Sequence, residues 1–161
     1  MTMKISVRGK IPTAVRKDIR SCIQFIGDHL LGSKLSKNVS VQVVITKGLL
    51  KRDKVDAWCV WDDDNYRPRD FLIEMDSALI DDRRRLSRVL CHEMVHVRQY
   101  ARSQLKDRMK GIMWKNRRVS EKTKYRDRPW EAEAFDLEEY LAEYWESYLR
   151  LRAKETAVSK N

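Results

Sequence analysis

Apolar residues recur every three or four positions in three long stretches of the chain, and this spacing predicts three helices. The predicted helices cover 12–31, 82–106 and 129–154. Pro12 and Pro129 suit the first turns of the first and third helices. We expect the polar chain after the third helix to fray.

Shorter stretches between the first two helices are rich in β-branched and aromatic residues that partly alternate with polar ones, as in strands. They cover 39–46, 55–61 and 70–76, and turn-forming residues are dense across 62–69. We predict a small, three-stranded, mostly antiparallel sheet. The order helix, three strands, helix, helix predicts an α+β fold. A length of 161 residues predicts a single domain, with its core at about 12–150.

The composition allows a core, since 42% of residues are hydrophobic, but the net charge of +10 makes the chain strongly basic. Residues 102–128 hold eleven Lys or Arg against three Asp or Glu, and we predict a basic loop over 107–128, with room for a short helix. Residues 129–150 are acidic. The basic segment is either a solvated loop balanced by the acidic helix or a contact for nucleic acid.

Several classes of protein do not fit the sequence. No apolar run is long enough for a membrane-spanning helix, and the first residues lack the apolar segment of a secretory signal, so we expect a cytoplasmic protein. Cys22, Cys59 and Cys91 are widely spaced and form no CxxC pair, which predicts free thiols in a reducing compartment.

The candidate chemistry lies in the second predicted helix, where His92-Glu93-Met94-Val95-His96 matches the pattern HExxH. Residues four apart share a helix face, so both imidazoles can reach one metal ion. Glu93 lies beside that face and can accept a proton from a metal-bound water.

The position of Glu93 supports a function independently of the motif. At ~100° per residue, Glu93 falls only about 40° from the centre of the apolar stripe of its helix. A carboxylate so close to apolar side chains is disfavoured unless it is paired or functional. The ordinary alternative is that Glu93 pairs with one of the many arginines.

A catalytic zinc ion needs a third protein ligand. His29, the only other histidine, lies in the first helix and is expected to be an ordinary one, so the third ligand should be a carboxylate. Glu131 and Glu133 open the last helix, with small alanines beside them that allow close helix packing. They point about 200° apart, so only one should face the metal, and periodicity does not separate them. Acidic residues also stabilise a helix N-terminus without any metal.

The run from His92 to Gln99, followed by Tyr125-Arg126-Asp127-Arg128-Pro129-Trp130-Glu131-Ala132-Glu133-Ala134, resembles the small, often phage-encoded SprT-like or minimal gluzincin metallopeptidases. The resemblance covers roughly 12–150 and implies a zincin-like fold, one Zn²⁺ per chain and, for a phage protein, a host-cytoplasmic location. It points to Glu131 as the third ligand. Phe135 departs from the pattern, at a place where an Asp would hold a ligand histidine, so Glu133 stays the alternative ligand.

Metallopeptidases of this kind add a donor that stabilises the oxyanion, and Tyr125, Tyr100 and Arg126 are candidates by their proximity to the motifs. The resemblance also implies that 70–76 forms a sheet edge above a cleft, where an extended peptide binds by strand addition.

Three functional hypotheses follow. The first is a zinc-dependent peptidase that acts on protein or peptide substrates, with His92, His96 and Glu131 as ligands and Glu93 as general base. The second is a basic nucleic-acid-binding module that uses 102–128 and whose metal site is structural or vestigial. The third is a protein that keeps this fold without hydrolysis and binds a partner through the cleft.

Overall fold

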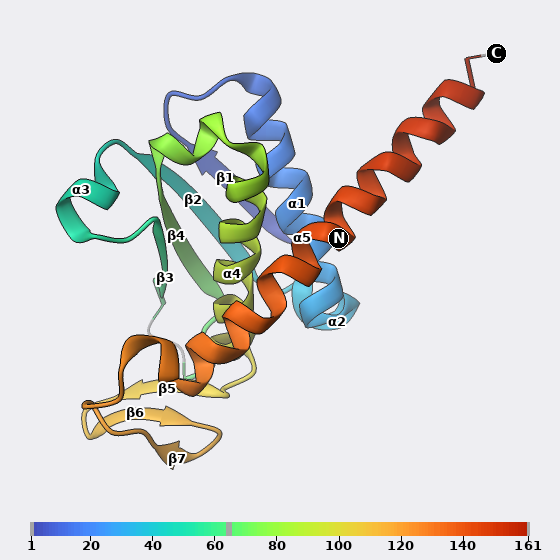
Figure 1. Cartoon of the computed structure of the whole chain (residues 1–161). Helices are drawn as coiled ribbons and strands as arrows, with labels where there is room; N and C mark the ends of the chain where they lie inside the picture. Colours follow the sequence, from blue (N-terminus) through green and yellow to red (C-terminus); the bar gives the residue numbers. More distant parts are fainter. Residues whose placement is uncertain (1, 64–65, 161) are drawn as a thin grey trace.

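The protein has an α+β fold, as the sequence predicts, and the computed structural model describes residues 2–63 and 66–160 (Figure 1). The helices are α1 (Thr13–Leu31), α2 (Ser33–Ser36), α3 (Leu49–Asp53), α4 (Arg83–Ala101) and α5 (Pro129–Val158), with 3-10 turns η1 (Ser77–Asp81) and η2 (Tyr125–Asp127). The strands are β1 (Lys4–Arg8), β2 (Ser40–Thr46), β3 (Ala57–Trp61), β4 (Asp70–Asp76), β5 (Leu105–Arg108), β6 (Gly111–Trp114) and β7 (Arg117–Arg118).

The main sheet is four-stranded and mixed, with the order β1-β2-β4-β3, so the prediction of three mostly antiparallel strands is wrong. β1 pairs with β2 and β2 with β4 in parallel, and only β3 and β4 are antiparallel. The parallel pairs arise because long connections, one of them α1, carry the chain back to the same end of the sheet. β1, a strand of five residues, is not among the strands predicted from the sequence.

The outer strand next to α4 is β3, and the prediction that 70–76 forms this edge is wrong. β4 lies between β2 and β3 and is paired along both sides. Its Phe71, Ile73 and Met75 are buried, as expected for a central strand.

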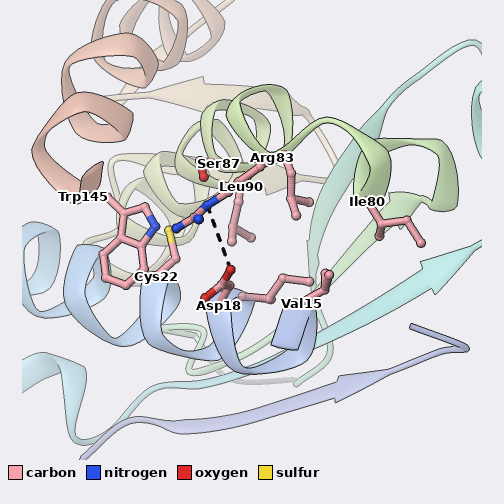
Figure 2. Close-up of a pocket in the computed structure, with 10 residues that line it drawn as sticks. Val15, Asp18, Cys22, Ile80, Arg83, Ser87, Leu90 and Trp145 are labelled. Atoms are coloured by element: carbon pink, nitrogen blue, oxygen red, sulfur yellow. Dashed lines mark ion pairs between the residues drawn. The ribbon is translucent and has the colours of Figure 1, made fainter. Parts of the chain in front are cut away.

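The helices α1 and α4 lie side by side on one face of the sheet (Figure 1). Their apolar stripes meet Val41, Val43 and Ile73 of the sheet in one hydrophobic cluster. α5 crosses α4 and inserts Trp145 into the same cluster, next to Cys22 and Leu90 (Figure 2). The core therefore fixes how α5 crosses α4, which is the crossing that positions the candidate site.

The ends of α4 and α5 differ from their predicted positions. α4 begins where the Asp82 carboxylate accepts a hydrogen bond from the Arg85 amide, 3.0 Å away, and it ends at Ala101 rather than at 106. Ser103 then takes a positive φ of 57°, which turns the chain out of the helix. α5 continues through Val158, so the expected fraying after its apolar part is not observed.

The predicted basic loop is mostly a second, antiparallel sheet of order β5-β6-β7, which is followed by η2. Lys115 and Asn116 both have positive φ between β6 and β7, as in a tight two-residue hairpin turn. The many charges in this segment hid short strands whose side chains are only partly covered.

Part of the predicted turn 62–69 is observed, since the Asp63 carboxylate accepts a hydrogen bond from the Arg69 amide at 2.9 Å. Asp64 and Asn65 lie outside the described residues. Within the described ranges, no helix combines the length and hydropathy needed to cross a membrane.

Candidate metal centre

The candidate centre lies where α4 crosses the first turns of α5. α4 presents His92 and His96 one turn apart, and Pro129 opens α5 so that Glu131 lies in its first turn. Ala134 is fully buried at this crossing, where its small side chain allows the helices to approach closely. Both helices are thus held by the core, and the site lies on rigid elements.

Three side-chain atoms converge at the crossing, one each from His92, His96 and Glu131. His92 Nε2 lies 3.2 Å from His96 Nε2 and 3.2 Å from Glu131 Oε2, and His96 Nε2 lies 3.4 Å from the same oxygen. All three residues are buried. This buried group can hold a metal ion.

The outer nitrogens of both imidazoles are occupied. His92 Nδ1 lies 2.8 Å from Glu138 Oε2, and His96 Nδ1 lies 2.8 Å from Gln99 Oε1. A carboxylate and an amide oxygen only accept hydrogen bonds, so each Nδ1 is a donor and carries the ring proton. In the neutral rings the Nε2 lone pairs therefore point to the centre, as in metal-binding histidines.

Gln99 links the two helices through this arrangement. Its Nε2 donates to the Trp130 carbonyl at 3.0 Å and to Glu133 Oε2 at 2.8 Å. Both partners are acceptors, which fixes the amide with its oxygen toward His96. The completely buried Gln99 thus orients His96 and holds the start of α5 against α4.

The pKa values reflect the crowding of these groups. Burial would raise the pKa of Glu131, but hydrogen bonds with His92 and His96 outweigh it and lower the pKa to about 2. Burial would lower the pKa of His92, yet its bonds to Glu131 and Glu138 raise the pKa to about 9. The pKa shifts show that a positive charge between the imidazoles and Glu131 is favourable. A proton or a metal ion can supply this charge.

Glu93 is buried beside this group, with 5% of its surface exposed. Its Oε2 atom has no hydrogen-bond partner among the described residues, so the alternative of a pair with an arginine is not observed there. Burial raises the pKa of Glu93, and the neighbouring histidines oppose this rise only in part. An unpartnered buried carboxylate is costly unless it has a function.

The two candidate third ligands have different surroundings. Glu131 contacts both histidines, whereas Glu133 Oε2 lies 2.8 Å from Arg98 and 2.8 Å from Gln99. The structure therefore brings Glu131, rather than Glu133, to the two histidines.

Of the three candidate oxyanion donors, Tyr125 is the one whose hydroxyl lies next to a candidate metal ligand. The hydroxyl of Tyr125 lies next to Glu131 and contributes to its lowered pKa, while about half of the residue is exposed. Tyr100 packs against Trp61, with 4.8 Å between ring centroids. Arg126 lies over the ring of Phe135 at 4.5 Å. His29, expected to be ordinary, packs against Tyr144 with 4.9 Å between ring centroids and is not part of the converging group.

Glu138, the partner of His92 Nδ1, is not among the site residues predicted from the sequence. Glu138 follows Glu131 by two helical turns, so the two residues share a face of α5, and this spacing could have revealed it. Phe135, where an acid was expected, instead packs its ring edge to face against His92 at 4.7 Å. Gln99 lies in the same run as the motif, but the sequence does not indicate that it orients His96.

Comparison of the chain with protein-family models, with curated proteins and with solved structures gives no match.

Proposed function

We propose that the protein is a zinc-dependent peptidase, with His92, His96 and Glu131 as metal ligands and Glu93 as general base. One observation carries the proposal: three buried donor atoms converge beside a buried carboxylate that has no partner among the described residues. An ion cluster with a purely structural role would not need the buried carboxylate of Glu93, which has no partner among the described residues.

The donor set fits zinc. Two imidazole nitrogens and one carboxylate oxygen are the protein ligands of many catalytic zinc sites, which keep one further position open. A zinc ion bound there supplies a Lewis acid, which polarises a carbonyl and lowers the pKa of water. The hydrogen bonds from Nδ1 of His92 and His96 keep both rings oriented for such an ion.

Glu93 would move the proton. Its carboxylate accepts a proton from the attacking water and returns it to the amine that leaves when the peptide bond breaks. A pKa raised by burial suits this role, because a base works best when its pKa lies near the working pH. The half-exposed Tyr125 would donate a hydrogen bond to the oxygen of the substrate carbonyl as charge develops on it.

The resemblance of the motifs to SprT-like and minimal gluzincin peptidases supports the same proposal. We infer a zincin-like arrangement, in which β3 is the edge strand beside the metal-binding helix and α5 supplies the third ligand. An extended substrate would then pair with the free side of β3 rather than with 70–76.

The test compares purified wild-type protein with Glu93→Gln. We expect about one zinc per chain in both proteins by elemental mass spectrometry, and we expect the variant to lose about 10²–10⁴-fold of the wild-type hydrolysis of an unfolded protein substrate. Glu143→Gln, an exposed acid on α5, is the control and should retain activity. Full activity in Glu93→Gln, or no zinc in the wild-type protein, would refute the proposal.

The second sheet favours a second candidate function, which is contact with nucleic acid. Arg108, Lys110, Arg117 and Arg118 are all exposed on β5–β7. Binding to random DNA that weakens steeply with salt, and that Arg117→Gln with Arg118→Gln reduces while zinc content stays constant, would support it.

A further inference from the structure

A groove opens directly beside His92, between the start of β3 and the junction of η2 with α5. Val89 and Phe135 give it an apolar floor, while Lys54 and Arg126 line it with positive charge. Because His92 also lines the groove, a substrate side chain in it would be adjacent to the candidate metal centre.

The acidic residues of the groove are already neutralised. Asp56 accepts two hydrogen bonds from Arg85 Nη2, at 2.7 and 2.9 Å. Glu138 is held by His92 at 2.8 Å and by Arg88 at 3.5 Å. Neither carboxylate is therefore free to receive a cationic side chain without giving up a partner.

Three exposed cations line the groove, and one of them, Arg88, pairs with Glu138 and Glu139. The other two have no such partners. Within the described ranges, neither Lys54 nor Arg126 forms an ion pair. Arg126 is held in place by Phe135, over whose ring its guanidinium lies at 4.5 Å. Lys54 ends α3 in a left-handed conformation with φ 61°, a backbone geometry that β-branched residues avoid.

We propose that this groove selects an acidic side chain of the substrate, so that the protein prefers peptides with Glu or Asp near the scissile bond. The apolar floor would contact the methylene groups, and Lys54 and Arg126 would pair with the carboxylate. The net charge of +10 attracts acidic chains to the protein in general, and the groove is where this attraction becomes specific. The inference rests on the proposed peptidase function.

Binding to the full-length Glu93→Gln protein, loaded with zinc, tests the preference without cleavage. The probes are fluorescein-labelled pools of random peptides that differ only in carrying Glu, Gln or Lys at a fixed central position. We expect the Glu pool to bind several-fold more tightly than the Gln pool and the Lys pool to bind most weakly. Added salt should reduce the difference, because the groove is partly exposed.

The cations are then removed one at a time. Lys54→Gln and Arg126→Gln should each weaken binding of the Glu pool about two- to five-fold and leave the Gln pool unchanged. Lys51→Gln on the same helix and Lys124→Gln in the same segment are matched controls, since neither residue lines the groove. Equal binding of the Glu and Gln pools, or equal losses in the control variants, would overturn the proposal.

Two further experiments distinguish binding of a substrate carboxylate from binding of phosphate, and failure of the groove proposal from failure of the peptidase proposal. If Lys54→Gln and Arg126→Gln weaken binding of a single-stranded DNA and not of the Glu pool, the groove receives phosphates and the inference is wrong. The wild-type protein is also incubated with the Gln pool. Failure to cleave that pool under any zinc concentration counts against the peptidase function, whereas the binding comparison decides the groove's preference independently.

Discussion

Glu138 accepts a hydrogen bond from Nδ1 of His92 across 2.8 Å, two turns of α5 after Glu131, which lies 3.2 Å from Nε2 of the same ring. One helix therefore holds both nitrogens of a histidine that belongs to another helix. The ring is fixed in tautomer and in orientation, and a small rotation of α5 about its axis would disturb both contacts together.

Removing Glu138 should weaken the metal site without removing a ligand. We expect Glu138→Ala to reduce zinc affinity about 10- to 100-fold, because His92 loses the acceptor that orients it. Competition with a chromogenic chelator measures the affinity. Glu139→Ala is the control, since Glu139 pairs with Arg84 at the surface. Equal affinities of Glu138→Ala and wild-type protein would show that the contact does not support the site.

Glu131 and Glu133 can be told apart by metal content. Glu131→Ala should abolish stoichiometric zinc binding, because it removes one of the three donors that converge among the described residues. Glu133→Ala should keep the zinc, although its loss frees Arg98 and Gln99. Elemental mass spectrometry on both purified variants distinguishes them, and loss of zinc in Glu133→Ala alone would reverse the assignment.

Asp76 should make stability depend on pH in the acid range. Its oxygens accept hydrogen bonds from the amides of Ala78 and Leu50, at 2.8 and 2.7 Å, and these bonds lower its pKa. A carboxyl whose pKa is lower in the folded state stabilises the fold above its unfolded pKa of about 3.9, and this contribution is lost as the pH falls through its folded pKa.

We therefore expect Asp76→Asn to destabilise the protein by about 1–3 kcal/mol at neutral pH, since the amide group cannot accept both bonds. The difference from wild type should shrink as the pH falls below about 4. Urea unfolding at several pH values measures it, with the exposed Asp81→Asn as control. A difference that is the same at pH 7 and in acid would contradict the assignment.

Trp145 should contribute strongly to the stability of the crossing between α5 and the core. It is almost completely buried and packs against Phe25 and Tyr148 at 5.7 Å each. Trp145→Ala should lower the free energy of unfolding by about 3–5 kcal/mol, because it leaves a large cavity. Leu151→Ala, on the exposed end of the same helix, should change it by less than about 0.5 kcal/mol. Similar losses in both variants, measured by urea unfolding, would contradict this account.

The long helices are predictable from the sequence because apolar residues every three or four positions mark the face of a helix that becomes buried. It failed on strand order, since pairing depends on contacts between distant residues such as Val43 and Ile73. It also missed β5–β7, whose strands are short and poorly covered, so that turn geometry at Lys115 and Asn116 matters more than hydrophobic pattern.

The candidate site was predictable where one helix carries it. His92, Glu93 and His96 follow from local spacing alone. The choice between Glu131 and Glu133 depended on how α5 rotates against α4, which is set by buried residues such as Ala134 and Trp145. The same rotation brings Glu138 to His92, whereas the sequence indicates only that Glu138 shares a helix face with Glu131.

The converging atoms come from α4 and α5, which contact each other directly, while the whole segment from 102 to 128 contributes none of them. A metal ion held by His96 and Glu131 would act as a cross-link that closes this segment into a loop. The chain entropy of such a loop rises only slowly with its length, by about 0.6 kcal/mol for each doubling. The second sheet could therefore be shortened or enlarged at little thermodynamic cost to the centre, so the metal-binding geometry does not fix the length of this segment.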